Sequence, residues 1–138
     1  MYVCPMKYEL QNCISSRLRK LSRIADGHMR NCLKEFGITE NQMTILFALS
    51  KLGKVEQGKI GETLVLERST VSRNVKLLEK QQLVRRTAAY RPEIELTKKG
   101  IILVNKLIPN WEKVMDSFVD MLGDYGTVPL EKLEQRII

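Results

Sequence analysis

The stretch ERSTVSRNVKLLEKQQLVRRTAAYRPEIELTKKG, residues 67–100, decides the fold. Its first part spaces Val71, Val75 and Leu78 along one face of a helix, which predicts an amphipathic helix over about residues 68–81. Its second part alternates apolar and polar residues in LVRRT and in EIELT, around an AAYRP segment whose proline a central strand would not tolerate. We therefore expect a helix followed directly by a β-hairpin with a short tip.

Three more helices are expected on the N-terminal side of this stretch. Apolar residues recur at steps of three and four over about residues 12–36, which is the spacing of one face of a long helix. Gly37 is expected to end that helix, and Thr39 to cap a second helix that ends at Gly53 and is apolar on most sides, hence central. A short third helix fits residues 57–64. The apolar residues of the first helix are Ile14, Leu18, Leu21, Ala25, Met29, Cys32 and Phe36.

A second long helix is expected from Lys98 onward, where apolar residues follow one another at steps that alternate between three and four. Pro109 lies inside this helix and is expected to kink it, because proline lacks the backbone donor and its ring crowds the preceding turn. After Gly123 and Gly126, a last short helix is expected over about residues 129–138. The apolar residues of the long helix are Ile101, Val104, Ile108, Trp111, Met115, Phe118 and Leu122.

The order of these elements is that of a winged helix-turn-helix: helix, helix, short helix, helix and β-hairpin. The predicted fold class is mainly α with a small β-hairpin wing, in which long N- and C-terminal dimerisation helices accompany the winged helix-turn-helix lobe. Residues 1–138 are expected to form one such domain, since no linker, repeat or low-complexity stretch divides them. Within it, residues 38–100 would form the DNA-binding lobe, and residues 8–37 and 101–138 the dimerisation helices.

The distribution of charge favours a polyanionic partner. Lys and Arg number 23 against 16 Asp and Glu, which gives a net charge of +7. Residues 1–53 carry 8 basic and 4 acidic residues, residues 54–100 carry 11 and 6, and residues 101–138 carry 4 and 6. The positive excess therefore belongs to the first two thirds of the chain, while the last third would gain nothing near DNA.

The helix predicted over residues 68–81 carries the candidate base contacts. Its polar face presents short hydroxyls, a lysine and Arg73, whose guanidinium can bond O6 and N7 of a guanine bidentately. The N-terminus of the helix also favours an anion. Arg85, Arg86 and Arg91 around the hairpin are expected to grip the flanking DNA backbone, or one of them to probe the minor groove. The candidate DNA contacts are Gln57, Lys59, Ser69, Thr70, Ser72, Arg73, Lys76, Arg86 and Arg91.

Each of these features also has an ordinary explanation, because a polar helix face or an arginine-bearing hairpin is often only a solvated surface. Their close succession between two long apolar helices favours binding to double-stranded DNA. A winged-helix module that binds only protein is the alternative, and it would leave the positive charge of residues 54–100 unexplained. With one histidine, no GxSxG motif and no Gly-rich phosphate loop, neither an enzyme nor a cofactor is expected.

Several segments, taken in order, resemble a known family. ERSTVSRNVKLLEKQQLVRR followed by LTKKG resembles the recognition helix, first wing strand and wing exit of the MarR-type winged-helix transcription regulators. FGITENQMTILFALSKLG, CISSRLRKLSR and LIPNW extend the resemblance over roughly residues 10–123. The family often has glycines where this chain has Val65 and Gln82, so the turns flanking the recognition helix are expected to use another geometry. The wing is shorter than usual, and AAYRPEIE lacks the acidic residue that often precedes the wing arginine.

The two long helices would leave apolar stripes bare in so small a monomer, so a partner is expected to cover them. Self-association is the simplest cover, and a twofold homodimer would present two recognition helices to the half-sites of a palindromic operator, about one DNA turn or ~34 Å apart. An intramolecular helical hairpin is the alternative. The resemblance implies that a small-molecule effector or an oxidant alters the separation of the two DNA-binding lobes. A repressor is favoured over an activator, because a dimer bound to promoter DNA can exclude the polymerase by occupancy alone.

The cysteines offer one candidate sensor. Cys4, Cys13 and Cys32 contain no CxxC pair, so neither a disulfide framework nor a zinc knuckle is expected. In position, Cys13 resembles the reactive cysteine of the organic-hydroperoxide-sensing branch of the family, where oxidation would introduce charge or a disulfide at the base of the dimer. The alternative is that Cys13 is only a packing residue.

The remaining features suit ordinary packing or bear on the compartment. His28 and Cys32 lie four residues apart, but no third metal ligand has a suitable spacing. No apolar run reaches the ~18 residues of a membrane span, and the N-terminus lacks the order of a signal peptide, so a soluble, cytoplasmic protein is expected. Positions in the core or a pocket wall are expected for Met29, Met43, Trp111 and Met115.

Overall fold

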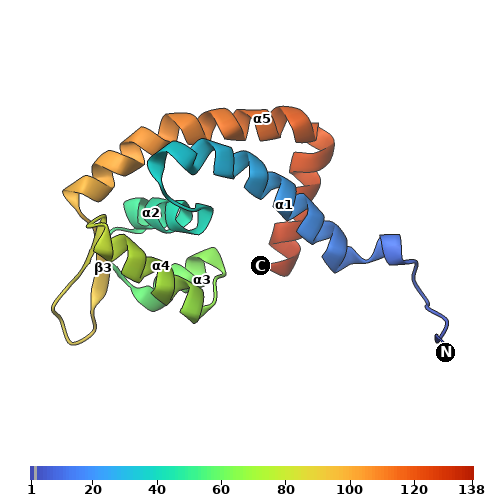
Figure 1. Cartoon of the computed structure of the whole chain (residues 1–138), viewed down its shortest axis with the longest axis horizontal. Coiled ribbons are helices and arrows are strands. Elements are labelled where there is room, and N and C mark those ends of the chain that lie inside the picture. The colour runs from blue at the N-terminus through green and yellow to red at the C-terminus, as the bar shows by residue number, and fades with distance from the viewer. Residues whose placement is uncertain (2) are drawn as a thin grey trace.

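The computed structural model describes residue 1 and residues 3–138, and it confirms the predicted fold class. Two long helices, α1 (Ile14–Leu33) and α5 (Lys98–Ile137), lie over a lobe of shorter helices, and a hairpin projects from that lobe on the far side (Figure 1). The other elements are η1 (Leu10–Asn12), η2 (Lys34–Phe36), α2 (Glu40–Leu52), β1 (Val55–Glu56), α3 (Gln57–Leu64), α4 (Arg68–Lys80), β2 (Val84–Arg86) and β3 (Glu93–Leu96).

Helix α2 is central, as predicted. A capping box starts it: the Thr39 hydroxyl accepts from the Gln42 amide at 3.3 Å, and the Gln42 side-chain oxygen accepts from the Thr39 amide at 3.1 Å. Gly53 ends it with a φ of 75°. Buried side chains of α2 meet those of every other α-helix in one core. The buried apolar residues are Met29, Leu33, Ile38, Met43, Ile45, Leu46, Ala48, Leu49, Ile60, Val71, Val75, Leu78, Leu83, Val84, Ile94, Val104 and Leu107.

The side chains expected in the core divide into two groups. Met29 and Met43 are buried, and half-buried Trp111 meets Phe47 edge to face, with the ring centroids 5.4 Å apart. Met115, in contrast, is 36% exposed. Val114 and Phe118, on either side of Met115, still pack against the core. Met115 therefore lies on another face of α5, and the expectation for this residue was wrong within a single protomer.

The predicted hairpin is confirmed, and a third strand joins it. β3 lies in the middle of an antiparallel sheet, with β2 on one side and β1 on the other. Buried Ile94 of β3 pairs with Val55 of β1 and with Arg86 of β2. The sequence did not indicate β1, because a strand of two residues is too short to show an alternating pattern.

The turns on either side of α4 correct an expectation. Because these positions lack glycine, the turns were expected to avoid the left-handed conformation. Val65 and Gln82 nevertheless adopt it, with φ values of 54° and 61°. The Leu66 amide donates to the Gly61 carbonyl at 3.0 Å, and the Leu83 amide donates to the Leu78 carbonyl at 3.0 Å. Each bond spans five residues, as in the motif that ends many helices with a left-handed residue. These bonds explain why the backbone is left-handed at both positions without glycine.

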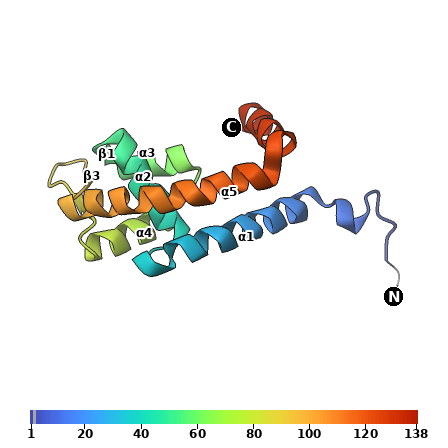
Figure 2. The same ribbon diagram turned by 90° about the horizontal axis from the view of Figure 1, so that it is seen from above.

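Helix α5 also differs from the prediction. The helix continues through Pro109, and its break lies at Gly123, where φ is 59° and ψ is −171°. This combination belongs to a region that only glycine adopts readily. Residues 124–137 are helical and turn away from the first part of α5, as Figure 2 shows, so the last helix begins before the predicted residue 129. We call residues 124–137 the C-terminal arm.

Helices α1 and α5 pack against each other only near the lobe. The Asn110 side chain donates to a carboxylate oxygen of Glu35 at 3.2 Å, and the rings of His28 and Phe118 lie edge to face at 5.7 Å. Farther out the N-terminal half of α1 exposes its apolar stripe, so that Ile14 is 69% exposed. Within the described residues, no helix is long and apolar enough to cross a membrane.

Candidate nucleic-acid interface

The solvent-facing side of α4 carries most of the predicted contacts. Val71, Val75 and Leu78 are buried, so the helix is held with its opposite face outward. Glu67 precedes α4 without a side-chain bond to its first turn, which leaves the amides of that turn open to an anion. On this face Ser69, Arg73 and Lys76 are exposed, and Thr70 and Ser72 are half-buried at its edges.

The wing is tied to α3 and α4 through Arg86. One Arg86 nitrogen, Nη2, donates to the side-chain oxygen of Gln57 at 3.0 Å and to a carboxylate oxygen of Glu79 at 3.1 Å. Gln57 begins α3 and Glu79 lies in the last turn of α4, so the network joins three elements. Two residues predicted to contact DNA, Gln57 and Arg86, therefore bond to each other in the free protein. This network could not be anticipated from the sequence, since Gln57 and Glu79 lie 29 and 7 residues from Arg86.

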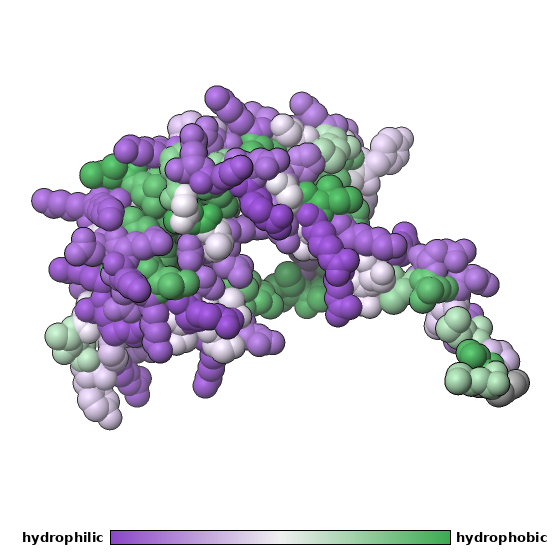
Figure 3. Space-filling view, in the orientation of Figure 1, coloured by the Kyte–Doolittle hydropathy of each residue, from purple (hydrophilic) through white to green (hydrophobic). Residues whose placement is uncertain are grey.

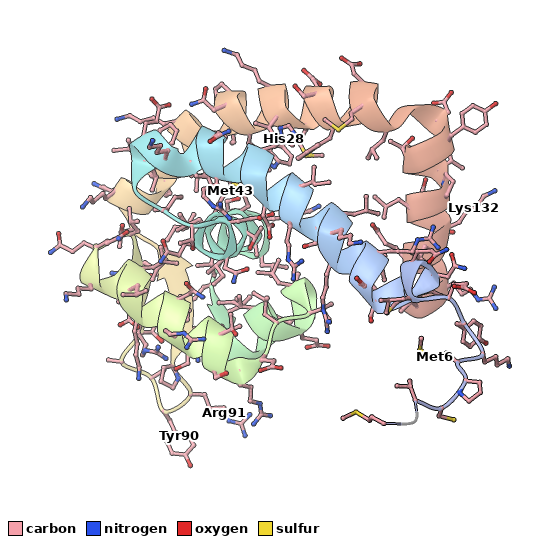
Figure 4. All side chains as sticks on the ribbon, turned by 45° about the vertical axis from the view of Figure 1, so that its right-hand side comes forward. Met6, His28, Met43, Tyr90, Arg91 and Lys132 are labelled. Carbon is pink, nitrogen blue, oxygen red and sulfur yellow. The ribbon has the colours of Figure 1, made fainter. Side chains whose placement is uncertain are left out.

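The other basic residues of this surface differ in how firmly they are held. Arg85 forms an ion pair with Glu95 across the two hairpin strands. Lys59 lies 4.0 Å from Glu62 on the exposed side of α3. Arg91 is exposed at the tip of the hairpin, beside Tyr90 (Figure 4). At the base of the surface, Lys59, Arg85 and Arg86 lie beside carboxylates. Arg91 is exposed at its tip.

The wing exit, LTKKG, serves to join the hairpin to α5. The Thr97 hydroxyl accepts from the Gly100 amide at 3.0 Å and donates to the Gln82 carbonyl at 2.6 Å. The backbone of Gly100 approaches the Leu83 carbonyl so closely that a Cβ at residue 100 would lie 2.1 Å from that oxygen. The motif therefore fixes the angle between wing and long helix by a cap and a close contact.

The surface of the lobe is predominantly hydrophilic where these residues lie (Figure 3). In the same view, apolar side chains gather around the opening between the lobe and the C-terminal arm.

The candidate sensor Cys13 precedes the first turn of α1. Its sulfur lies 3.5 Å from the Ser15 hydroxyl, and this hydrogen bond, followed by bonds from neighbouring amides, lowers the pKa of the Cys13 thiol. Burial raises the pKa of the Cys32 thiol, and Glu35 adds to that effect. Of these two thiols, Cys13 is thus the one whose surroundings favour the thiolate. Cys32 and His28 belong to no group of three possible metal ligands among the described residues.

A pair of carboxyl groups was not anticipated from the sequence. Asp26 of α1 and Glu40 of α2 line the same cavity, of about 380 Å³, together with Arg30. Burial raises the pKa of Glu40 to about 7, and a hydrogen bond and repulsion from Asp26 add to the shift. The pair lies where α1 meets the lobe, and the 13 residues between the two acids hid it in the sequence.

Known proteins share both the sequence and the fold. The pattern of the MarR family matches residues 36–91. The HTH-type transcriptional regulator MhqR of Bacillus subtilis is 23% identical over 124 residues, which cover 87% of this chain and 86% of that protein. The HTH-type transcriptional regulator SarZ of Staphylococcus epidermidis is 32% identical over 90 residues, 62% of this chain and 61% of that protein.

Solved structures agree over nearly the whole chain. BpsR of Bordetella bronchiseptica, described with the regulation of its DNA binding by 6-hydroxynicotinic acid, superimposes with a TM-score of 0.86 at 18% identity, over 96% of this chain and 98% of that one. The M. tuberculosis transcriptional regulator MosR in complex with DNA superimposes with a TM-score of 0.78 at 26% identity, over 90% and 93% of the two chains.

Proposed function

This chain belongs to the MarR family of transcription regulators, and on that premise we propose that it binds a palindromic operator as a homodimer and represses transcription until a ligand or an oxidant releases it. It is a winged helix-turn-helix DNA-binding regulator and not an enzyme. DNA complexes of related regulators support this function, and nothing among the related proteins supports a module that binds only protein.

The exposed apolar surface of the long helices supports the homodimer. Ile14, Leu18 and Leu21 of α1 are each more than half exposed, although they continue the stripe that is buried near the lobe. The C-terminal arm and the residues before it expose a second set: Val119, Met121, Leu122, Val128, Leu130, Leu133 and Ile137. A second copy of the chain would bury both sets, because a twofold interface places the same surfaces against each other.

Within the dimer, each α4 would enter a major groove of the operator. The open N-terminus of α4 and the hydroxyls of Ser69, Thr70 and Ser72 are suited to phosphates and base edges. Arg73 lies at the centre of the exposed face and is proposed to recognise guanine. Lys59 and Lys76 would contact flanking phosphates, and a promoter covered in this way excludes the polymerase.

Release would come from a change in the separation of the two lobes. The structure of BpsR concerns regulation by 6-hydroxynicotinic acid, and that of the repressor CouR contains p-coumaroyl-CoA, so small molecules act on proteins of this fold. We propose a small-molecule effector for this chain as well. We propose a cytoplasmic location, because a transcription regulator must reach chromosomal DNA.

Oxidation of Cys13 is the second proposed signal. The lowered pKa of this thiol and its place at the start of the exposed part of α1 support the proposal. Peroxide is expected to lower DNA affinity in the wild type and in Cys32→Ser, but not in Cys13→Ser. Unchanged affinity of a protein whose Cys13 is shown by mass spectrometry to be oxidised would refute this role.

Selection of binding sites from a randomised DNA pool tests the main proposal. We expect a palindrome whose half-sites lie about one helical turn apart, bound by a species of dimeric mass in sedimentation, with affinity that falls steeply as salt rises. Monomeric mass at micromolar concentration would contradict the homodimer. DNA binding without sequence preference would contradict the proposed recognition of an operator. Absence of DNA binding at low salt would favour a module that binds only protein.

Arg73→Ala is the sharpest variant for this experiment. Loss of a bidentate guanine contact is expected to cost about 1–3 kcal/mol at the selected operator and to relax preference at one base pair of each half-site. Lys80→Ala, which removes an exposed cation from the last turn of the same helix, serves as the control and should leave base preference intact. If Arg73→Ala retains the wild-type affinity and preference, Arg73 does not recognise a base.

A further inference from the structure

The outer half of α1 concentrates positive charge outside the candidate DNA-binding surface. Residues 10–25 contain four basic residues and no acidic one, and we call them the basic segment. Its cations are Arg17, Arg19, Lys20 and Arg23, and all four are exposed. The same turns of the helix carry apolar side chains that are each more than half exposed: Ile14, Leu18, Leu21 and Ile24. A surface that combines exposed apolar groups with one sign of charge suits a partner of the opposite charge.

The outer part of α5 and the start of the C-terminal arm carry that opposite charge. Residues 114–131 contain four acidic residues and no basic one, and we call them the acidic segment. Its carboxylates are Asp116, Asp120, Asp124 and Glu131, and all four are exposed. The exposed apolar side chains of this segment are Met115, Val119, Met121, Leu122, Val128 and Leu130. The two segments therefore match in apolar content and are opposite in charge.

Neither segment is neutralised within one protomer. In the part of the chain that the structure describes, every ion pair joins residues between 59 and 95, inside the lobe. Helix α1 descends away from α5 as both leave the lobe (Figure 1), which keeps the two segments of one chain from pairing with each other. Their charges are therefore available to another molecule.

Charge decides how two copies of the chain can bury these surfaces. In a twofold interface, if residue i of one copy meets residue j of its partner, residue j of the first copy also meets residue i of the partner. Packing each segment against its own equivalent would place four cations opposite four cations, and four carboxylates opposite four carboxylates, which is unfavourable. Packing the basic segment against the partner's acidic segment places opposite charges together at two symmetric positions.

On each helix, two of the charges border the exposed apolar stripe. Arg17 and Lys20, which we call the cation pair, each lie one turn before an exposed apolar residue of α1. On α5, Asp116 borders exposed Val119 in the same way, and Asp120 lies one turn farther along; we call the two acids the carboxylate pair. The members of a pair are about 4.5 Å apart along α1 and about 6 Å apart along α5, so the two pairs are matched in spacing.

From this arrangement we propose that the basic segment of each copy packs along the acidic segment of its partner, with the cation pair opposite the carboxylate pair. The inference rests on the proposed homodimer and specifies which surfaces meet in it. Apolar stripes alone would accept many amphipathic helices, whereas charges at the edge of the interface penalise a partner whose charge pattern differs. The pattern therefore restricts the chain to dimers with its own copies and excludes mixed dimers with regulators of other charge patterns.

Charge reversal in the whole chain tests the pairing. Arg17→Glu/Lys20→Glu and Asp116→Lys/Asp120→Lys each place like charges opposite each other in a homodimer. Each variant alone should therefore dimerise with a dissociation constant at least about tenfold above that of the wild type in sedimentation equilibrium. An equimolar mixture restores opposite charges at both positions, so it should form a heterodimer of about wild-type affinity, identified by its mass in native mass spectrometry. This recovery also shows that both variants are folded.

Two further variants test selectivity and position. The variant with all four reversals should form homodimers again, because its reversed pairs are complementary, but it should form no mixed dimer with the wild type. Arg19→Glu/Arg23→Glu is the matched control: it reverses two charges of the same segment on the side of α1 away from the apolar stripe, where salt screens them from the interface. This control should change the dissociation constant by less than about threefold.

Three results would count against these proposals. The inference is overturned if either variant of a single pair forms homodimers within about twofold of the wild-type affinity, or if the mixture forms no heterodimer. It is also overturned if Arg17→Glu/Lys20→Glu stays dimeric but loses operator affinity, because the basic segment would then contact DNA. A wild type of monomeric mass would instead refute the proposed homodimer, on which the inference rests.

Discussion

At the scale of the residue, Gly100 carries the clearest consequence, because a Cβ at this position would lie 2.1 Å from the Leu83 carbonyl oxygen. That oxygen belongs to the backbone and accepts a hydrogen bond from the Thr97 amide, so it cannot move aside without opening the join between wing and α5. Gly100→Ala is therefore expected to lower the free energy of unfolding by about 2–4 kcal/mol in urea denaturation at fixed protein concentration. Gly27→Ala is the control: nothing lies within 4 Å of its Cβ position in α1, so better helix propensity should raise stability by up to about 1 kcal/mol. Equal effects of the two substitutions would contradict the close contact.

At the scale of the element, the question is whether Arg86 holds the wing or contacts phosphate. If it holds the wing, Glu79→Gln and Arg86→Met should each weaken operator binding by about 1 kcal/mol, since each removes the ion pair between β2 and α4. Glu79→Gln discriminates best, because removal of a negative charge near DNA would otherwise strengthen binding. Affinities across a salt series provide the measurement. Tighter binding by Glu79→Gln, together with a reduced salt dependence in Arg86→Met, would show instead that Arg86 contacts phosphate.

At the scale of the whole molecule, the Asp26 and Glu40 pair makes the junction between long helices and lobe sensitive to pH. The pKa of Glu40 is raised to about 7 in the folded protein, chiefly by burial, so the folded state holds a proton that the unfolded chain releases. The resulting stabilisation is complete below the ordinary pKa of a glutamate and is lost as pH rises through about 7. With Glu40 partly exposed, we expect a loss of about 1 kcal/mol between pH 5.5 and 8.5. Glu40→Gln should flatten this dependence and the exposed Glu62→Gln should not, as measured by denaturation at each pH; equal slopes in all three proteins would contradict the coupling.

Helices could be predicted from the sequence where apolar residues recur at regular spacing or where a capping residue marks a helix end. Val71, Val75 and Leu78 located α4 and its outward face, and Thr39 and Gly53 marked the ends of α2. The features that were missed depend on contacts between distant segments, such as the Arg86 network and the pairing of β1 with β3. The geometry of the turns at Val65 and Gln82 was mistaken because local backbone hydrogen bonds at the two helix ends, from Leu66 to Gly61 and from Leu83 to Leu78, outweigh the preference of a single residue.

The break at Gly123 has a consequence for how such a regulator diverges. The direction of the C-terminal arm depends on one pair of backbone torsions, in a region closed to residues with a side chain. Any substitution at residue 123 would redirect the arm, and in a dimer held by that arm it would change the distance between the two lobes. A descendant gene with one altered codon would then favour a different half-site spacing while every base-contacting residue stayed the same. In the proposed homodimer, position 123 would thus be a point at which a duplicated copy of this regulator leaves its parent's promoters in a single mutational step.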